Sequence, residues 1–491
     1  MARSRPASAS TEADDPHDAP SGADEEGAAG QRDGRDPGEV SGDGSDEDAG
    51  EGYVVRHRKK APPLPGQESS DETLDLEELG NLSMAEMVER VRRYGIEAHE
   101  GLDRAKVLVQ LMRLGDKQGL RMQGQGQLEI MPDGYGFLRA PRNSFLAAPS
   151  DLYIAPEMIR SFKLRPGMTV TGLVRRGHRK DKYFAITEIL TVNGVDPAEA
   201  ATWQVFEDLT PVFPDTRVLL EHESREMSTR IVDLVSPIGF GQRGLIVSPP
   251  RSGKTMMLKA LAAGISANYP DAKLVMFLVD ERPEEVTDML RSIHGEVIFS
   301  TFDEPPQRHV QVAQRVTDRV RSLVEAGHDV VLLIDSLTRL GRAFNAAARG
   351  SGKIMTGGLD SNALQKPKRL FSSARNIDGA GSLTILATAL VDTNSRMDEV
   401  IFEEFKGTGN MEIVLSRAVS EQRIYPAIDI HKSGTRNEEL LFDPAEAELV
   451  HGLRKALADL TAVDAIDALL GKLRKTGSNA EFLLSLTQQR F

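Results

Sequence analysis

Residues 248 to 255, SPPRSGKT, have the composition of a loop that holds phosphate groups. The segment ends like a nucleotide-binding P-loop, although Ser248 stands where the usual pattern has glycine. Gly253 lets the backbone close on a phosphate, Lys254 can reach the β- and γ-phosphates, and Thr255 places a hydroxyl where Mg²⁺ needs a ligand. The sequence therefore predicts a phosphate site that is altered at its start and intact at its chemical end.

The flanking residues decide between this interpretation and an ordinary strand–turn–helix that carries a surface lysine. The apolar run GLIV (244–247) precedes the loop as a buried strand would, and residues 256–269 are apolar at helical spacing. A helix that starts behind the loop adds amide donors and a favourable dipole for an anion. Pro249 and Pro250 hold the chain extended as it leaves the strand. This context favours the P-loop.

Acidic residues follow two further apolar runs. Asp335 ends the run VVLLID, and Asp280 and Glu281 follow LVMFLV (274–279). Ligands bind at the carboxyl ends of parallel strands. There Asp335 could hold Mg²⁺ through water, and a carboxylate at the other strand end could orient and deprotonate an attacking water. Each acid alone is also compatible with a helix cap or a surface charge, but the three strand ends together favour nucleotide hydrolysis.

Five near-continuous apolar runs alternate with segments long enough for crossover helices, which is typical of strands buried on both faces of a parallel sheet. The runs lie at 244–247, 274–279, 296–299, 330–334 and 383–390. We therefore predict a doubly covered α/β domain over residues 231–491. Residues 121–195 contain short alternating runs broken by turns, which predict a small β-barrel. Residues 196–230 are predicted to be a connector.

A small helical module, residues 76–120, is predicted before the barrel. Order is expected to begin near Leu82, because Ser83 and Glu86 can form a capping box at the start of a helix. A second helix is expected after Asp103. The sequence of this module does not indicate what it binds.

Residues 1–75 are predicted to be disordered, since they are rich in Gly, Ala, Ser, Pro, Asp and Glu and have little apolar surface to bury. Their acidity means that the folded part is closer to neutral than the formal net charge of −14 suggests. A basic run at 56–60, RHRKK, is either a solvated linker or an auxiliary phosphate contact. The chain has no cysteine, no apolar run near the roughly 20 residues of a membrane span, and no signal-peptide core. We therefore expect a soluble cytoplasmic protein without a membrane partner.

Six motifs stand in this order along the chain: GLIVSPPRSGKT, DERPEEVTDM, LLIDSLTRLGRAFN, SGKIMTGGLD, VDTNSRMDEVIFEEFKGTGNME and RIYPAIDIHKSGTRNEELL. Together they closely resemble the bacterial transcription termination factor Rho family. The resemblance extends from about Leu82 to the C-terminus and leaves out only the acidic extension. It implies a homohexameric ring of RecA-like P-loop ATPase domains with ATP between neighbouring subunits. It also implies that the barrel is OB-like, similar to a cold-shock domain, and binds RNA.

The resemblance assigns roles around the nucleotide. Glu281 matches the glutamate that activates water, Asp335 the Walker B aspartate, and Lys254 the P-loop lysine. Arg436 in SGTR matches the arginine finger that one subunit supplies to the ATP of its neighbour. The other matched positions are Arg282 near the γ-phosphate, Tyr425 against adenine, and Ser248, Arg251, Ser252, Gly253, Thr255, Met256 and Arg339 around the nucleotide. ATP and Mg²⁺ are the implied cofactors, with Thr255 and Asp335 at the metal.

The resemblance also implies RNA contacts in two channel loops and in the barrel. Segment 348–358 resembles the Q-loop and DTNSR (392–396) resembles the R-loop. The implied RNA contacts are Tyr135, Phe137, Arg139, Tyr153, Arg160, Asp181 and Tyr183 in the barrel, and Lys353, Thr393, Arg396 and Lys406 in the channel. Tyr135, Phe137 and Arg139 share one strand face, and aromatic rings stack on unpaired bases for about 1–3 kcal/mol each. Without the resemblance, the aromatic pair is also compatible with core packing, and segment 348–358 with a flexible surface loop.

Four positions depart from the family pattern. Arg251 stands where some members have lysine, and a planar guanidinium contacts phosphate differently from a point ammonium. Tyr135 stands where a member has phenylalanine, which is a mild change. Asp181 stands near a glutamate of the base pocket and is shorter. Asn394 stands where another member has glycine, so the local backbone is expected to differ.

We therefore predict an RNA-stimulated ATPase and 5′→3′ RNA/DNA translocase that binds pyrimidine-rich single-stranded RNA and ends transcription by the RNA polymerase elongation complex. Two alternatives remain. A rotary ATP synthase catalytic subunit shares the α/β core and the N-terminal barrel but has no use for base-stacking aromatic side chains. An RNA-binding protein with a decayed ATPase domain is disfavoured, because the catalytic residues of the P-loop and strand ends are all present.

Overall fold

The computed structural model describes residues 73–96, 99, 101–176, 183–348 and 354–488. All of them belong to one compact unit, Ser69–Phe491. Residues 1–72, which make up most of the acidic extension and include the basic run at 56–60, lie outside the described residues. Within the described part, no helix is both long and apolar enough to cross a membrane.

The predicted barrel is present and is closed by one long strand. Its strands are β2 (Met122–Ile130), β3 (Gly136–Arg139), β4 (Leu152–Ile154), β5 (Thr169–Arg175) and β6 (Phe184–Val192), with η1 (Pro141–Asn143) and α4 (Pro156–Ser161) between them. The order β2-β3-β4-β6-β5 closes because β2 also pairs with β5. Most pairs are antiparallel, and β4 and β6 are parallel. This closure places β3 and β4 side by side, so their outward-facing side chains form one surface.

The helical module contributes to the barrel instead of standing apart from it. It contains α1 (Leu76–Asn81), α2 (Met84–Arg92) and α3 (Arg104–Gln118). The capping box of Ser83 and Glu86 and the cap at Asp103 are confirmed. Order begins before Leu82, however, because β1 (Leu74–Asp75) pairs in parallel with β2 and the Asp75 side chain caps α1. Apolar side chains of both parts fill one shared core.

The α/β domain is built on a parallel sheet with the order β12-β11-β13-β17-β10-β18. Its strands are β10 (Arg243–Ser248), β11 (Lys273–Glu281), β12 (Glu296–Thr301), β13 (Val330–Asp335), β17 (Ser382–Leu390) and β18 (Met411–Val414). The five predicted strands are confirmed. The sequence missed β18, since four residues of alternating polarity do not stand out from a loop. Shorter antiparallel strands extend the sheet: β19 (Gly434–Thr435), β16 (Arg375–Ile377) and β7 (Pro211–Val212).

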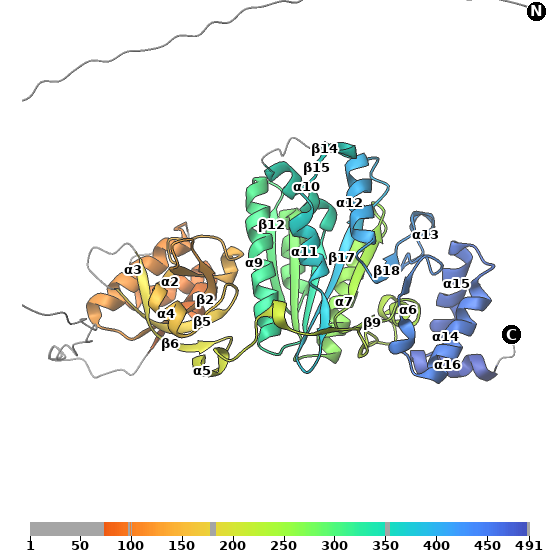
Figure 1. Cartoon of the computed structure of the whole chain (residues 1–491), viewed down its shortest axis with the longest axis horizontal. Coiled ribbons are helices and arrows are strands. Elements are labelled where there is room, and N and C mark those ends of the chain that lie inside the picture. The colour runs from red at the N-terminus through yellow and green to blue at the C-terminus, as the bar shows by residue number, and fades with distance from the viewer. Residues whose placement is uncertain (1–72, 97–98, 100, 177–182, 349–353, 489–491) are drawn as a thin grey trace, which may run out of the picture. The chain divides into compact units, whose positions relative to one another are not determined.

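Both faces of this sheet are covered, as the apolar runs predicted (Figure 1). Alternate residues of β11 enter different cores: Val275 and Phe277 enter one, and Met276 and Leu278 enter the other. The first core includes α9 (Pro306–Glu325), α10 (Leu337–Ala347), α11 (Gln365–Ser372) and α12 (Arg396–Lys406). The second includes α6 (Met227–Val235), α7 (Lys254–Asn268), α8 (Pro283–Ser292), α14 (Pro444–Leu457), α15 (Ala462–Leu473) and α16 (Asn479–Gln488).

The connector adds structure of its own. It holds α5 (Pro197–Ala200), η2 (Phe206–Asp208), β7 and β8 (Arg217–Val218), and β8 pairs with β9 (Ile238–Gly239). Because β7 pairs with β16, the connector supplies a strand to the main sheet. The remaining short elements are β14 (Ile354–Met355), η3 (Thr356–Gly358), β15 (Leu359–Asp360), α13 (Arg417–Glu421) and η4 (Glu438–Leu440).

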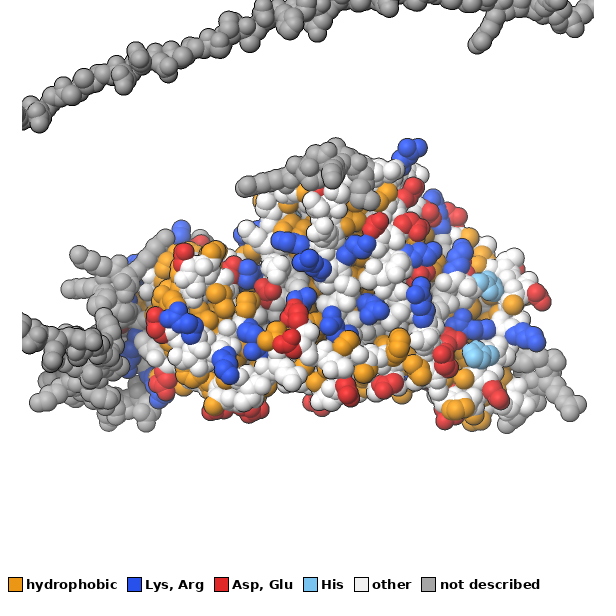
Figure 2. All heavy atoms as spheres, in the orientation of Figure 1, with side chains coloured by type: hydrophobic (Ala, Val, Ile, Leu, Met, Phe, Trp, Pro, Cys, Tyr) orange, Lys and Arg blue, Asp and Glu red, His pale blue; other side chains and the backbone are white. Residues whose placement is uncertain are grey.

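The surface carries charges of both signs. On the face seen in Figure 2, Lys and Arg side chains are spread across much of the α/β domain, with Asp and Glu side chains between them. This face is therefore not uniformly acidic, although the whole sequence carries a formal net charge of −14.

A buried carboxyl group holds the loop that leads into α6. Asp233 is buried, and its oxygens accept hydrogen bonds from the backbone N–H groups of Leu220 (3.1 Å) and Glu221 (2.8 Å). Burial raises the pKa of Asp233 to about 7, against the opposing effects of Arg217 and the two backbone donors. The folded chain therefore binds this proton more tightly than the unfolded chain. The resulting stabilisation is complete below about pH 4 and is lost as the pH rises through about 7.

Replacing Asp233 by Asn should remove this pH dependence. The amide does not titrate, so its effect on the free energy of unfolding is the same at every pH. Between the pKa values of Asp233 in the unfolded and folded chain, the free energy of unfolding of the wild type should fall relative to that of Asp233→Asn by about 1.4 kcal/mol per pH unit. Thermal midpoints of both proteins at pH 5 and pH 8 measure this change. An equal difference in midpoint at both pH values would contradict the assignment.

Candidate active site and nucleic-acid interface

The loop between β10 and α7 has the geometry of a phosphate cradle. Gly253, the N-cap of α7, has φ +93°, a conformation that favours glycine, and Lys254 and Thr255 begin the helix. Ser248 takes part in the hydrogen bonds of the loop. Its hydroxyl lies 2.9 Å from the hydroxyl of Ser252, which donates to the Pro249 carbonyl at 2.8 Å. The residue that replaces the usual glycine therefore fixes the start of the loop from within.

Lys254 joins the P-loop to the acidic strand ends. Its Nζ lies 2.6 Å from Asp335 Oδ1 and 3.8 Å from Glu281 Oε2. Both carboxylates are buried, and the three side chains come together because the carboxyl ends of β10, β11 and β13 share one edge of the sheet. Breaking a buried ion pair by removing one partner typically costs about 3–5 kcal/mol. The ammonium group thus offsets the charge of two buried carboxylates at this edge of the sheet.

A β-bulge decides which of the two acids at the end of β11 joins this cluster. The β11–β12 register shifts between Val279 and Glu281, and Asp280 has φ +56°. The bulge turns Glu281 into the buried cluster, where its side chain is 2% exposed. Asp280 instead offers its backbone carbonyl to the Arg339 guanidinium. Glu281 is therefore the acid that lies beside the P-loop lysine.

Glu281 has the surroundings expected of a general base. Its Oε1 lies 3.5 Å from Arg339 Nη2, and its buried Oε2 accepts no hydrogen bond from the described residues. Burial raises the pKa of Glu281, the cations Lys254 and Arg339 lower it, and Asp335 raises it again. A buried carboxylate with a raised pKa and one oxygen that accepts no hydrogen bond from the described residues is suited to accept a proton from water.

Thr388 belongs to this cluster, and the sequence analysis missed it. Its hydroxyl lies in the buried middle layer of β17 and donates to Asp335 Oδ1 at 2.8 Å, which orients the carboxylate that Lys254 contacts. A polar residue within the apolar run LTILATAL was the available signal.

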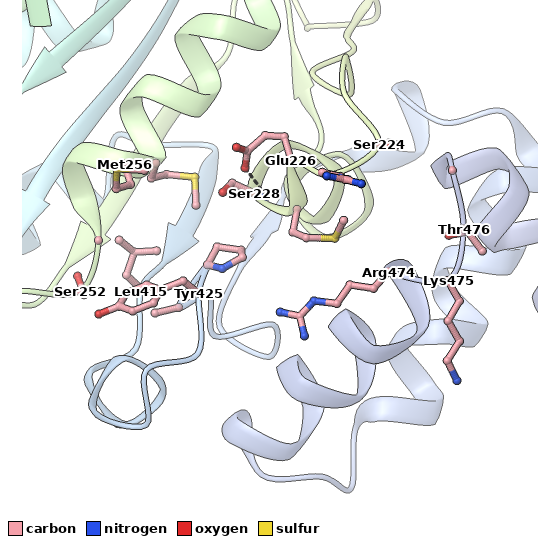
Figure 3. A pocket seen from close by; sticks show the side chains of 17 residues that line it. Ser224, Glu226, Ser228, Ser252, Met256, Leu415, Tyr425, Arg474, Lys475 and Thr476 are labelled. Atoms are coloured by element: carbon pink, nitrogen blue, oxygen red, sulfur yellow. Dashed lines mark hydrogen bonds between the residues drawn. The ribbon is translucent and has the colours of Figure 1, made fainter. Parts of the chain in front are cut away.

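A cavity of about 980 Å³ opens beside the P-loop (Figure 3). Ser252, Gly253 and Met256 line it on the P-loop side, and Tyr425 lies next to them. A Cβ atom at Gly253 would lie 3.5 Å from the Tyr425 ring, so the ring sits directly over the loop. Tyr425 and Met256 are 45% and 69% exposed. Two exposed apolar side chains that face a cavity next to a phosphate cradle are suited to hold a nucleobase.

The far wall of this cavity was not foreseen. Residues 474–477, which link α15 to α16, line it, and Arg474 extends toward the Tyr425 side while Lys475 points away (Figure 3). Residues 224–228 complete the wall, with Glu226 held by a hydrogen bond from the Ser228 N–H. The sequence offered no signal for Arg474, because it reaches the P-loop only through the packing of the C-terminal helices.

Three predicted nucleotide contacts lie apart from the lysine cluster within one chain. Arg251, with φ +64°, is exposed on the P-loop. Arg282 is exposed and lies 3.8 Å from Glu285. Arg436 is exposed, lines a separate cavity of about 410 Å³, and lies close enough to Arg243 to lower the pKa of that guanidinium, after the larger effect of burial. The structure thus brings together Lys254, Glu281, Asp335 and Arg339, but leaves these three arginines outside.

The predicted base-contacting aromatic residues form one cluster on the barrel. The Phe137 ring centroid lies 5.8 Å from that of Tyr135, 6.2 Å from Tyr153 and 4.9 Å from Tyr183. The three tyrosines are half-buried, and Phe137 is 9% exposed. Partly exposed rings gathered on β3, β4 and the start of β6 offer faces to an unstacked base.

Arg139 shares this face, as predicted, but it is not a free cation. Its guanidinium lies 4.8 Å from the Phe137 ring centroid, donates to Glu129 Oε2 at 2.6 Å and bonds Asp151. The side chain is 8% exposed. Its contact with a phosphate or a base edge stays a prediction, because the guanidinium already bonds two carboxylates and packs against the Phe137 ring.

The other predicted RNA contacts differ in the exposure and the partners of their side chains. Arg160 is exposed and lies 3.3 Å from Glu157. The Thr393 hydroxyl donates to Asp398 at 2.6 Å, while Arg396 begins α12 and is exposed. Lys406 ends α12 with its Nζ 5.5 Å from the Phe402 ring centroid.

Two predicted contacts, Asp181 and Lys353, lie outside the described residues. Asn394 has φ +58°, which is the left-handed conformation that glycine favours. Among the other residues, Asn and Asp adopt this conformation most readily. The expectation of a different local backbone therefore has no support at this dihedral.

No group of three or more His, Asp or Glu side chains among the described residues is arranged to hold a metal ion. Thr255 and Asp335 nevertheless supply oxygen atoms near the cradle, and Mg²⁺ at nucleotide sites commonly takes one or two protein ligands together with phosphates. The residues present therefore fit an ion that arrives with a nucleotide.

Comparisons with known proteins match both domains. The Rho termination factor RNA-binding domain family matches residues 124–198, and the nucleotide-binding domain of the ATP synthase alpha/beta family matches residues 228–435. Transcription termination factor Rho of Rhodopirellula baltica is 50% identical over 431 residues, which cover 87% of this chain and 84% of the relative. The Cereibacter sphaeroides and Pseudomonas aeruginosa proteins of the same name are 48% and 47% identical, cover 85% of this chain, and are themselves covered to 99% and 100%. Among solved structures, a type III secretion ATPase is similar at a TM-score of 0.49 and 21% identity, over 62% of this chain and 94% of that one.

The pH dependence of nucleotide hydrolysis tests the position of Glu281. Removing the Arg339 cation should raise the pKa of Glu281 further, so the acid limb of the kcat/KM profile for Arg339→Met should move to higher pH. The matched control is Arg342→Met, one turn further along α10, where the guanidinium pairs with Asp398 instead. A lower rate for Arg339→Met with an unmoved acid limb would show that another group governs the profile.

Proposed function

The chain belongs to the transcription termination factor Rho family, and we propose that it uses ATP hydrolysis to move 5′→3′ along nascent single-stranded RNA and so end transcription. The partner that this activity requires is the RNA polymerase elongation complex. Its place of action would be the cytoplasm. The proposal rests on one observation above the others: Lys254 joins the P-loop to the buried Glu281 and Asp335 at one sheet edge.

The lysine cluster supports a direct mechanism for hydrolysis. Lys254 would leave Asp335 for the β- and γ-phosphates of ATP, whose charge exceeds that of the carboxylate. Glu281 Oε2 would accept a proton from the attacking water, and Arg339 would keep Glu281 ionised while fixing its position. Thr388 would hold Asp335 in the orientation needed for the Walker B role.

Thr255 and Asp335 would hold Mg²⁺ with the nucleotide. The ion would neutralise charge that develops on the phosphates during transfer. Tyr425 and Met256 would hold the adenine, and the P-loop residues Ser248, Arg251, Ser252 and Gly253 would frame the phosphates. Arg474 extends toward the same cavity, so it is an additional candidate for contact with the base or ribose.

The position of Arg436 supports a shared active site. It is exposed and away from Lys254 of its own chain, as an arginine finger for a neighbouring subunit must be. Arg282, also exposed, would lie near the γ-phosphate. We therefore propose a homohexameric ring in which ATP binds between subunits.

The aromatic cluster supports RNA binding by the barrel. Tyr135, Phe137, Tyr153 and Tyr183 would stack on pyrimidine bases, with Arg160 and Asp181 at the edge of the site. The 3′ part of the RNA would pass the channel residues Lys353, Thr393, Arg396 and Lys406. Aromatic stacking is sequence-tolerant, so a preference for pyrimidines would come from the shape of the pocket.

A rotary ATP synthase subunit is the second candidate, because the α/β domain matches the nucleotide-binding domain of that family. The barrel decides against it, since residues 124–198 match an RNA-binding domain and the aromatic cluster has no role in a rotary subunit.

Replacing Glu281 by Gln should lower the rate of ATP hydrolysis by about 10²–10⁴-fold, with and without RNA, because the amide cannot accept the proton. Asp280→Asn is the matched control, since the neighbouring acid contacts Arg339 through its backbone carbonyl, which the substitution keeps, and the rate should stay within about threefold of wild type. Steady-state ATPase assays at saturating ATP measure both. Equal losses in the two variants, or full activity in Glu281→Gln, would refute this role for Glu281.

Mixed rings test whether Arg436 acts in a neighbouring subunit. Arg436→Ala and Lys254→Ala should each lose hydrolysis by about 10³-fold or more. Subunits of the two variants, unfolded and refolded together, should regain part of the activity, because some interfaces then combine an intact P-loop with an intact Arg436. Wild-type subunits treated in the same way are the control. A mixture that stays inactive while the control recovers would exclude a role in trans.

A further inference from the structure

An ion-pair relay connects the aromatic cluster of the barrel to the α/β domain. Glu129 on β2 lies between two arginines: its Oε2 accepts from Arg139 Nε at 2.6 Å, and its Oε1 accepts from Arg315 Nη2 at 2.6 Å. Arg139 supports Phe137 in the barrel, whereas Arg315 lies on α9 of the α/β domain. One carboxylate therefore touches both the RNA-binding surface and the domain that carries the P-loop.

The relay lies in a tight, shielded contact. The side chains of Arg139, Glu129 and Arg315 are 8%, 20% and 17% exposed, so solvent screens their charges much less than those of a surface pair. The backbone carbonyl of Arg315 also accepts a hydrogen bond from the buried Gln127 side chain at 2.8 Å. A Cβ at Gly167 would lie 2.0 Å from the backbone oxygen of residue 318, so the barrel backbone meets α9 directly.

The far end of α9 reaches the catalytic edge of the sheet. At the start of α9, His309 Nδ1 lies 2.8 Å from the hydroxyl of Ser300 on β12. In the turn before the helix, the Phe302 N–H donates to the backbone carbonyl of Glu281 at 3.1 Å. A shift of α9 is therefore connected through a few hydrogen bonds to the backbone that carries the proposed general base.

The charges around Glu129 allow a second pairing. In the structure, Glu129 is shared between the two arginines, while Arg139 is also bound to Asp151. A phosphate or a base acceptor that binds Arg139 would compete with Glu129 for the guanidinium, because Nε and Nη1 already bond the carboxylates of Glu129 and Asp151. If Glu129 were released from Arg139, it would pair with Arg315 alone. This would change the electrostatic interaction between the barrel and α9.

We propose that Glu129 and Arg315 are positioning residues that transmit occupation of the barrel by single-stranded RNA to the ATPase site. This inference rests on the proposed function, because it requires RNA at the aromatic cluster. Such coupling between two sites is reciprocal and typically amounts to about 5–150-fold in affinity. Bound nucleotide should therefore change the affinity of the barrel for RNA by a factor that the relay sets.

The test uses the full chain with Arg315→Met, which removes the guanidinium on α9 and leaves Arg139, Glu129 and Asp151 intact. The ATPase rate without RNA and the affinity for a short cytidine oligonucleotide, measured by fluorescence anisotropy, should stay within about twofold of wild type. Stimulation of ATP hydrolysis by cytidine-rich RNA should fall at least about fivefold. The change in oligonucleotide affinity on adding a non-hydrolysable ATP analogue should be lost as well. Arg315→Lys, which keeps the charge next to Glu129, should restore part of both effects.

Arg319→Met is the matched control, because Arg319 also lies on α9 and contacts the barrel at Thr169 but does not touch Glu129. It should keep RNA stimulation. Equal losses in Arg315→Met and Arg319→Met would overturn the relay in favour of general domain docking, and normal stimulation in Arg315→Met would overturn it outright. A wild-type chain that does not bind the oligonucleotide would instead refute the proposed RNA-binding function.

Discussion

The contact between the Lys254 ammonium and the buried carboxylates of Asp335 and Glu281 is the interaction on which the catalytic part of the structure depends. These charges are tolerated away from water because they lie together, and they lie together because the strands run parallel and end at one edge. The sheet in turn is held by two apolar cores, one on each face. A bound triphosphate would compete with Asp335 for Lys254 and so free Asp335 for a metal ion. Lys254 and Asp335, which pair with each other in this structure, would then each contact the nucleotide or its metal ion.

The barrel also contains a shielded cation held between two carboxylates, but there the cation lies against an aromatic ring. Arg139 is buried beneath Phe137 and is neutralised by Glu129 and Asp151, and burial raises the pKa of Asp151 against the effects of a backbone donor and of Arg139. The Arg139 guanidinium lies 4.8 Å from the Phe137 ring centroid, and the neighbouring tyrosines are more exposed than Phe137. In both places a cation that contacts two carboxylates supports the side chains around it.

Much of the fold follows from local patterns in the sequence. Five apolar runs identified the central strands, and the capping box at Ser83 was readable because its hydrogen bonds span only three residues. The P-loop was readable for the same reason. The helical module was not foreseen as part of the barrel, because the pairing of β1 with β2 joins segments about 50 residues apart. The C-terminal helices and the short β18 gave no comparable signal.

The site could be predicted only as far as contacts along the chain allowed. Residue type and position after the strand did not distinguish Asp280 from Glu281; the family resemblance selected Glu281, and the bulge in β11 gives the physical reason. Thr388 and Arg315 bond residues far away in the sequence, and Arg474 lines a cavity with such residues, so their residue types alone carried little information. Arg139 was placed on the correct face, but its carboxylate partners come from two other segments of the barrel and were invisible to a pattern of alternating residues.

The most direct measurement of the central claim is steady-state ATP hydrolysis by the wild-type chain, with and without cytidine-rich single-stranded RNA and with a fully double-stranded RNA as control. If the barrel and the P-loop domain work as one machine, single-stranded RNA should stimulate hydrolysis strongly and double-stranded RNA should not. Vigorous hydrolysis that is indifferent to RNA would contradict the account and favour another ring ATPase. Absence of hydrolysis in every condition would contradict the assignment of the lysine cluster as a catalytic site.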